Sequence, residues 1–154
     1  MPYITEILDQ LGYAKHFSFL DLAMGYHQLD IDTSDIDKTA FSTKEGHWAY
    51  KRMPFGLITA PATFQKMMNN VLSGLTSTRC FVCLDDIVIY AIDNDRKLTD
   101  VFRRLRKYNL KLQPDKCEFL RKEVTFLGHK ISERGVEPDA RKVESVKNFP
   151  TPRR

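Results

Sequence analysis

The sequence predicts an α+β fold, with one antiparallel sheet and helices packed on one of its faces. Short apolar segments alternate with two longer segments of helical periodicity. Their order, strand–helix–strand pair–helix–strand, suits a ferredoxin-like arrangement. With 154 residues the chain can bury one hydrophobic core but hardly two. We therefore expect one domain over residues 1–149, followed by a proline-punctuated linker over residues 150–154.

Periodicity and turn residues justify the elements of the first half. Residues 3–12 have helical spacing and a glycine stop, and residues 16–22 read as a strand with an acid near its end. Alternation in HQLDID predicts extended chain, and the Asp/Ser/Thr cluster over residues 32–37 predicts a turn. Two strands, over residues 38–43 and 47–53, should follow, joined at a Glu-Gly pair.

The second half begins with a helix that Pro61 opens and that keeps its apolar spacing as far as Leu75. Two short strands are expected around Asp85 and Asp86, before a helix over residues 95–110 with one apolar face and a basic remainder. The sequence then predicts a loop over residues 113–119, a strand over residues 124–131 and a short helix over residues 139–148.

Charge is distributed unevenly along the chain. Residues 1–95 carry 7 basic and 12 acidic side chains, whereas residues 96–154 carry 17 basic and 8 acidic ones. This asymmetry suggests a polyanion held near a cation-binding site, although solvated helix faces would give the same pattern. No apolar run approaches the ~20 residues that span a bilayer, and no basic-then-apolar leader precedes the first helix. We expect a soluble, intracellular protein with no membrane partner.

Two adjacent carboxylates, Asp85 and Asp86, interrupt the apolar, β-branched run CFVCLDDIVIYA. Burial of such a pair is costly unless something neutralises it. At a hairpin tip both could project from the sheet, as they would in an ordinary solvated turn. Asp21 ends another apolar strand, and acids at two strand ends can meet on adjacent strands. Three carboxylates and a few backbone carbonyls would suit two Mg²⁺ ions, which could activate a hydroxyl and stabilise a leaving pyrophosphate.

The cysteines predict neither a zinc site nor a redox site. Cys80 and Cys83 spell CxxC, but residues i and i+3 of a strand face opposite ways, and the sequence has no second pair. Three cysteines, an odd number, do not suggest a disulfide framework either.

Five segments resemble, in the same order, successive motifs of reverse transcriptases, in particular those of gypsy-type LTR retrotransposons. They are FSFLDLAMGYHQLDID, KTAFSTKEGHWAYKRMPFGLITAPATFQ, CLDDIVIY, LKLQPDKCEF and FLGHKIS. The resemblance covers nearly the whole chain, including GVEPDARKVESVKNFPTP near its end. It implies an RNA-directed DNA polymerase, a nucleotidyltransferase, with residues 1–149 forming the palm, part of the fingers and the start of the thumb. Residues 150–154 would be a truncated linker.

The resemblance also implies roles for single residues. Asp21, Asp85 and Asp86 would be the catalytic, metal-binding carboxylates, and the Leu22 carbonyl would be a further ligand of two Mg²⁺ or Mn²⁺ ions. Tyr26 would lie under the incoming sugar and favour dNTPs over rNTPs, although without the resemblance it reads as a core aromatic. The remaining implied residues are Leu22, Phe55, Gly56 and Lys116 for nucleotide binding and Cys83, Phe126, Leu127, Gly128 and His129 for primer binding.

Two positions depart from the family's usual pattern. Cys83 stands where an aromatic residue, most often tyrosine, is usual, and Thr59 stands where asparagine is usual. The resemblance therefore implies that Cys83 removes an aromatic platform close to the primer terminus.

The same resemblance implies the partners and the cellular location. The partners would be an RNA or DNA template with its primer, dNTPs and the rest of a Pol polyprotein. Because MPYITEILDQLG resembles the segment just before the first catalytic strand, we expect the upstream fingers to be missing. We also expect most of the thumb, RNase H and integrase of the parent polyprotein to be missing. The expected location is the cytoplasm, in a virus-like particle of the parent element, or alternatively the nucleus.

Two other functions stay open. A catalytically silent retrotransposon remnant, or a domesticated nucleic-acid-binding protein, would share this ancestry and differ only in retained activity. An independent ferredoxin-like RNA-binding module that uses sheet aromatics is a weaker alternative, because three acids at the end of the sheet would repel phosphate.

Overall fold

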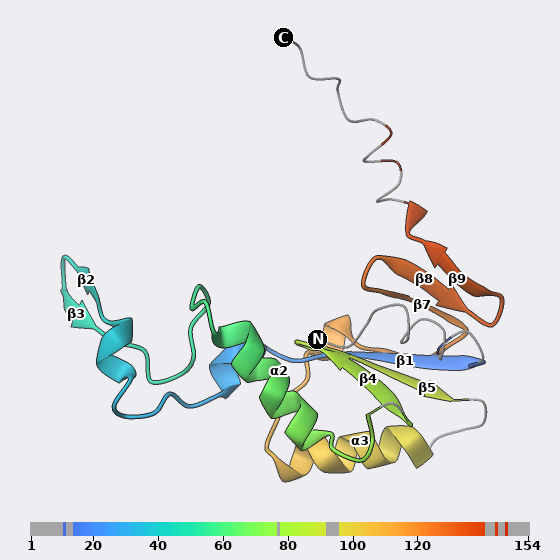
Figure 1. Cartoon of the computed structure of the whole chain (residues 1–154), viewed down its shortest axis with the longest axis horizontal. Helices are drawn as coiled ribbons and strands as arrows, with labels where there is room; N and C mark the ends of the chain where they lie inside the picture. Colours follow the sequence, from blue (N-terminus) through green and yellow to red (C-terminus); the bar gives the residue numbers. More distant parts are fainter. Residues whose placement is uncertain are drawn as a thin grey trace.

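A four-stranded antiparallel sheet with strand order β4-β5-β1-β6 lies at the centre of the molecule (Figure 1). The computed structural model describes residues 11, 14–76, 78–91, 96–140, 144 and 147. The strands of the sheet are β1 (His16–Asp21), β4 (Cys80–Cys83), β5 (Asp86–Ala91) and β6 (Glu118–Arg121). Helix α2 (Ala60–Val71) connects β1 to β4, and helix α3 (Arg96–Lys107) connects β5 to β6. The predicted ferredoxin-like order is therefore confirmed.

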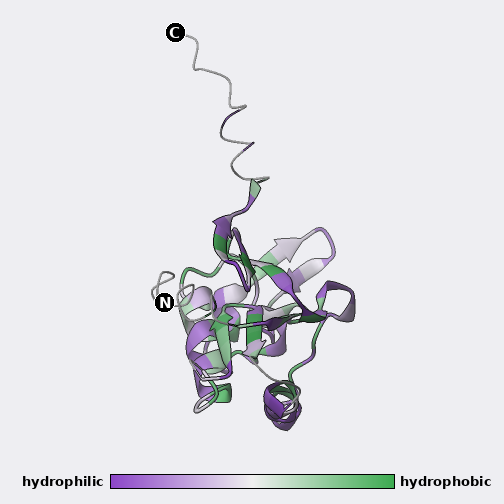
Figure 2. Ribbon diagram, turned by 90° about the vertical axis from the view of Figure 1, so that its right-hand side faces the viewer, coloured by the Kyte–Doolittle hydropathy of each residue, from purple (hydrophilic) through white to green (hydrophobic). Residues whose placement is uncertain are grey.

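Both helices pack on one face of this sheet, where they form the helix-side core. Helix α2 contributes Phe64 and Met68, and α3 contributes Val101 and Leu105, all of which are buried. From the sheet, the helix-side core contains Leu20, Cys80, Val82, Ile87 and Ile89. Figure 2 shows that α3, seen nearly end-on, is largely hydrophilic, as expected for an amphipathic helix that buries one stripe.

A second, three-stranded sheet covers the opposite face. Its strands are β7 (Glu123–Phe126), β8 (His129–Ser132) and β9 (Gly135–Pro138). The buried cluster between the two sheets, the sheet-side core, contains Leu11, Ala14, Phe17, Phe81, Cys83, Val88, Val124, Phe126 and Ile131. Because the central sheet is covered on both faces, β4 and β5 are apolar in nearly every position instead of alternating.

The chain between β1 and α2 forms an arm that extends away from the central sheet (Figure 1). It contains two 3₁₀ helices, Gly25–Gln28 and Ile36–Thr39, and the hairpin of β2 (Phe41–Thr43) and β3 (Gly46–Trp48). The predicted extended segment HQLDID is thus wrong in its first part. Met24 has a left-handed φ of 49°, and the chain then turns through the first 3₁₀ helix.

Other element boundaries also differ from the prediction. Strands 38–43 and 47–53 are shorter than expected, and α2 ends at Val71, so that Leu75 joins the helix-side core from beyond the helix. The predicted loop 113–119 contains a 3₁₀ helix, Pro114–Lys116, and the start of β6. The predicted strand 124–131 is the hairpin of β7 and β8, because Leu127 and Gly128 have positive φ and reverse the chain.

The predicted helices 3–12 and 139–148 lie largely outside the described residues, as does the linker 150–154. Within the described ranges, no helix has the length and apolar character needed to cross a bilayer.

Candidate active site

The two adjacent carboxylates lie at the tip of the β4–β5 hairpin, as predicted. Cys83 pairs with Asp86 across the two strands, which leaves Leu84 and Asp85 as a two-residue turn. Leu84 has a φ of 56°, a left-handed conformation that suits a tight hairpin but strains a residue other than glycine.

The third carboxylate faces this hairpin from the neighbouring strand. In the antiparallel register of β1 and β5, Asp21 pairs with Asp86, so both side chains lie on the same face of the sheet. The Leu22 N–H donates a hydrogen bond of 3.2 Å to the Asp85 carbonyl, which joins the end of β1 to the turn. The Gln113 N–H donates to the Asp21 carbonyl at 2.9 Å. The fold therefore brings together the ends that carry Asp21, Asp85 and Asp86.

The Asp85 side chain packs tightly against the residues next to the turn. Its Oδ1 atom is buried and has no hydrogen-bond partner among the described residues. A Cβ atom built on Gly25 would overlap Asp85 Oδ1 and would stand 2.8 Å from Phe64 Cζ. The absence of a side chain at Gly25 thus gives the Asp85 carboxylate its space.

The electrostatic environment disfavours ionisation of the hairpin carboxylates. Burial and the negative charge of Asp21 raise the pKa of Asp85 and of Asp86, and Asp85 raises the pKa of Asp86 further. Lys116 opposes these effects on both groups. Its Nζ atom lies 3.6 Å from Asp21 Oδ2. The site therefore places one nearby ammonium group against three carboxylates.

These features fit a divalent cation in donor type and in charge. Carboxylate oxygens are hard ligands that suit Mg²⁺, and a cation would relieve both the repulsion and the unpartnered Asp85 Oδ1. The carboxylates are not already gathered around a common point, however. Within the described part of the chain, no three His, Cys, Asp or Glu side chains form a ready metal-binding group.

Aromatic rings adjoin the carboxylates. The Tyr26 ring lies 5.2 Å, centroid to centroid, from the rings of both Phe55 and Phe64. Burial and the charge of Asp85 raise the pKa of Tyr26. Phe55 is 62% exposed, and Gly56 has a φ of 91°, so the backbone conformation explains the glycine there. Of the residues expected to bind nucleotide, Tyr26 and Lys116 therefore lie beside the carboxylates, and Phe55 packs against Tyr26.

The residues expected to bind primer gather on the sheet-side face. Cys83 and Phe126 belong to the same sheet-side core, and Leu127 packs against it. Phe126 is only 1% exposed, so its ring holds the β7–β8 hairpin on the sheet and does not reach the surface. His129 follows the turn, with Nδ1 3.2 Å from the Leu127 carbonyl oxygen.

The two cysteines of the CxxC sequence face opposite ways, as expected. Cys80 lies in the helix-side core and Cys83 in the sheet-side core. Burial raises the pKa of Cys80 to about 12, which keeps its thiol protonated at neutral pH.

Comparison with known proteins identifies the family. Residues 2–131 match the family described as reverse transcriptase (RNA-dependent DNA polymerase). The chain belongs to the reverse transcriptase family. It is 49% identical, over 99% of its length, to the retrovirus-related Pol polyprotein from transposon 297 of Drosophila melanogaster, and 36% identical to that from transposon gypsy. It spans 15% of the length of each of these two relatives.

Solved reverse transcriptases share the fold. The foamy viral protease-reverse transcriptase in complex with double-stranded DNA matches 99% of this chain and 27% of its own, with a TM-score of 0.86 and 26% identity. The same viral protein in complex with an RNA/DNA hybrid matches 93% of this chain and 20% of its own, with a TM-score of 0.80. The family and fold class expected from the sequence are thus confirmed.

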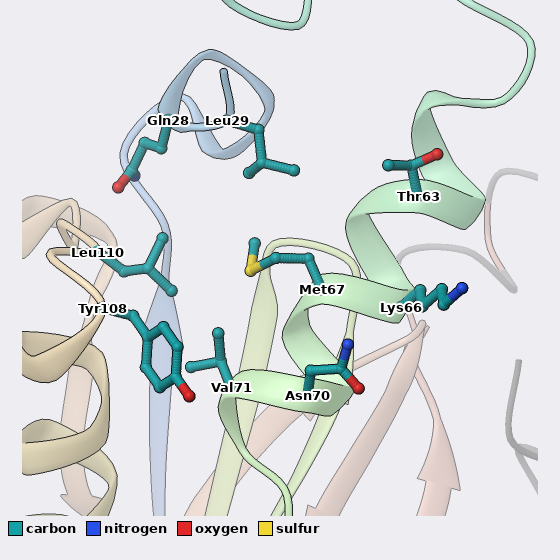
Figure 3. Close-up of a pocket in the computed structure, with 9 residues that line it drawn as sticks. All are labelled: Gln28, Leu29, Thr63, Lys66, Met67, Asn70, Val71, Tyr108 and Leu110. Carbon is teal, nitrogen blue, oxygen red and sulfur yellow. The ribbon is translucent and has the colours of Figure 1, made fainter. Parts of the chain in front are cut away.

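In this member of the reverse transcriptase family, Gln28 supports the loop that follows Asp21, a role that the sequence does not single out. Its Nε2 donates to the carbonyls of Ala23 (2.7 Å) and Lys111 (2.9 Å), and its Oε1 accepts from the Lys111 N–H (2.7 Å). Gln28 also borders a pocket of about 500 Å³ between this loop, α2 and the segment after α3 (Figure 3). Leu29, Met67 and Leu110 point into that pocket, and none of the predicted site residues lines it.

Gly25 is the second supporting residue, and it offers a direct test of the packing under Asp85. We expect Gly25→Ala to lower the free energy of unfolding by ~1–3 kcal/mol, because the added methyl group must displace the Asp85 carboxylate or Phe64. Urea unfolding would measure the change. Ser42→Thr, which adds one methyl group at an exposed position, is the matched control. Equal stability of Gly25→Ala and its parent would contradict the crowding.

Because the pKa of Asp85 is raised, we expect replacement of its carboxylate by a neutral amide to stabilise the fold, by an amount that depends on pH. A raised folded pKa means that this group's contribution to stability is greatest below its unfolded pKa, about 3.9, and is lost as pH rises through the folded value. At pH 7 without divalent cations, we expect Asp85→Asn to raise the Tm by no more than a few degrees, because solvent screens the charge of a partly exposed group. The gain should vanish near pH 3.

Calorimetry of the parent and of Asp85→Asn at both pH values would test this expectation. Asp37→Asn removes an exposed carboxylate from the arm and should leave the Tm unchanged at either pH. A lower Tm for Asp85→Asn at pH 7 would show that the Asp85 carboxylate stabilises the fold.

Proposed function

We propose that this chain is the catalytic palm of an RNA-directed DNA polymerase, which adds dNTPs to the 3′-OH of a primer. The observation that carries the proposal is the pairing of Asp21 with Asp86 across two strands, with Asp85 at the adjoining tip. An ordinary surface turn leaves its carboxylates in water, whereas Asp85 Oδ1 is buried without a hydrogen-bond partner among the described residues. A bound cation would supply that partner.

The proposed reaction is nucleotidyl transfer. The primer 3′-hydroxyl loses its proton to solvent and its oxygen forms a bond to the α-phosphorus of the dNTP, the bond from that phosphorus to its bridging oxygen breaks, and pyrophosphate leaves. When bound, two Mg²⁺ ions, or Mn²⁺, would activate the attacking hydroxyl and offset charge on the leaving group. Asp21, Asp85, Asp86 and the Leu22 carbonyl would hold them.

Other residues of the chain would orient the nucleotide. Lys116, whose Nζ atom lies beside Asp21, carries the positive charge that a triphosphate needs. The half-buried Tyr26 ring, packed between Phe55 and Phe64, would lie under the sugar and leave no room for a ribose 2′-OH. Phe55 and Gly56 would contact the incoming nucleotide.

The proposed partners are a primer–template duplex and the remainder of a Pol polyprotein. The similar viral protein is bound to double-stranded DNA in one structure and to an RNA/DNA hybrid in another. The turn of β7 and β8, with Leu127, Gly128 and His129, would support the primer end next to Cys83. The excess of basic residues after residue 95 would add salt-sensitive attraction to phosphates. The proposed location is the cytoplasm or the nucleus.

Polymerase activity should depend on segments outside this chain. Phosphoryl transfer requires positioned reactants as well as cations, and the chain spans 15% of the length of the transposon 297 relative. In primer extension with Mg²⁺ and dNTPs, we expect little product from the 154 residues alone and robust product from a version extended with flanking Pol segments. Removal of Mg²⁺ with EDTA should abolish that product.

Asp85→Asn in each version is the control for this assay. Robust extension by the 154 residues, lost in their own Asp85→Asn variant, would show that the palm is self-sufficient. A folded extended version that makes no product would favour a catalytically silent relative. In that case Cys83→Tyr would be the first reversion to test.

Sugar selection should depend on the Tyr26 ring. In the extended version, we expect Tyr26→Ala to reduce the ratio of kcat/KM for dNTPs to that for rNTPs by at least about tenfold, since the space under the sugar opens. Tyr26→Phe keeps the ring and should keep the ratio. An unchanged ratio in Tyr26→Ala would show that Tyr26 only packs against Phe55 and Phe64.

A further inference from the structure

We propose that Gln65 of helix α2 is a positioning residue, whose side-chain amide fixes the backbone of the turn that carries Asp85. Within the described residues, Ser18 and Gln65 are the polar side chains that the fold buries, and Gln65 is 7% exposed. It lies beside the apolar stripe that runs through Phe64, Met68 and Val71. A polar group at such a position needs a specific set of partners.

The partners of Gln65 lie on either side of Cys83 in the β4–β5 hairpin. Its Nε2 donates a hydrogen bond of 3.1 Å to the Val82 carbonyl, and its Oε1 accepts one of 2.8 Å from the Leu84 N–H. One amide therefore binds the last part of β4 and the first residue of the turn. Asp85 follows Leu84 directly, so the direction of the backbone at Leu84 sets where Asp85 begins.

A third hydrogen bond fixes the orientation of this amide. Gln65 Nε2 also donates to Asn69 Oδ1 at 3.0 Å, one helical turn further along α2. Both N–H groups and the carbonyl oxygen of Gln65 are thus engaged, and each bond requires the donor or acceptor that glutamine supplies there. Neither methionine nor leucine could replace any of the three bonds.

The turn has a physical need for such a restraint. Leu84 holds a φ of 56°, which is strained for a residue with a side chain and persists only where surrounding contacts impose it. The Leu84 N–H that Gln65 binds belongs to this strained residue. Helix α2 also supplies Phe64, which adjoins Gly25 under Asp85. The helix therefore fixes Asp85 from two sides, through the turn backbone and through the packing of its carboxylate.

This inference rests in part on the proposed polymerase function, so its test has one arm that needs no activity. In the 154-residue chain, amide hydrogen exchange measured by NMR reports whether the Leu84 N–H is held. We expect Gln65→Met to leave the circular dichroism spectrum unchanged and to speed exchange at Leu84 by at least about tenfold. Asn69→Ala, which removes only the orienting partner, should speed it less. Asn70→Ala, on the exposed side of α2, should not change it.

The second arm uses the extended version in primer extension. Misplacement of Asp85 should slow the chemical step more than it weakens nucleotide binding. We therefore expect Gln65→Met to lower kcat at least about tenfold with KM for dNTP within about threefold, and Asn70→Ala to match the parent in both.

The outcomes separate this inference from the proposed function. Unchanged Leu84 exchange in both Gln65→Met and Asn69→Ala would overturn it, as would a retained kcat in Gln65→Met. If Gln65→Met does not fold, the Asn69→Ala exchange rate decides. An extended version that is inactive even without substitution would overturn the polymerase proposal, and the exchange data alone would then decide the role of Gln65.

Discussion

Mutual repulsion among Asp21, Asp85 and Asp86 is the constraint on which much of the structure depends. The three acids share one end of a sheet that is covered by helices on one face and by β7–β9 on the other. Burial and their own charges raise the pKa of both hairpin carboxylates, so the arrangement weakens the fold at neutral pH unless a cation is bound. Two apolar cores, one on each face, supply the stability that this arrangement draws on. The covered sheet therefore both buries the hairpin carboxylates and supplies the stability that offsets their repulsion.

Local backbone and hydrogen-bond features fix the parts of the site that apolar packing alone does not determine. Gly25 leaves space for a carboxylate, Leu84 turns the chain within two residues, and Gln28 ties the loop after β1 to Lys111. Each feature involves backbone conformation or one specific hydrogen bond, and none adds much buried apolar area. The geometry of the proposed catalytic site therefore depends on residues that contribute little to the core.

The sequence predicts the central sheet well because long-range burial leaves a periodic pattern. Apolar runs around Asp85 and the helical spacing of Phe64 and Met68 indicate β4, β5 and α2, and the hairpin tip follows from the charge pair. Turns left weaker signals: the reversal at Leu127-Gly128 falls inside an apolar segment that reads as one strand. Residues that support the site through hydrogen bonds give almost no signal in the sequence. Gln65 looks like a polar residue at the edge of an amphipathic helix, and only its backbone partners in the hairpin, 17 and 19 residues away, reveal its place.

The repulsion among the three carboxylates also affects the adjacent residue Cys83. It pairs with Asp86, it is 7% exposed, and burial together with the charge of Asp86 raises its pKa. The raised pKa keeps this group a neutral thiol at pH 7, so it adds no fourth negative charge to the site. A thiol also fills less space than the aromatic ring that the family resemblance leads one to expect there. Cys83 thus adds no charge beside the carboxylates and leaves a smaller side chain in the core next to them. If the chain acts as the proposed polymerase, any loss of efficiency that Cys83 causes should therefore come from primer placement, and not from the proposed cation site.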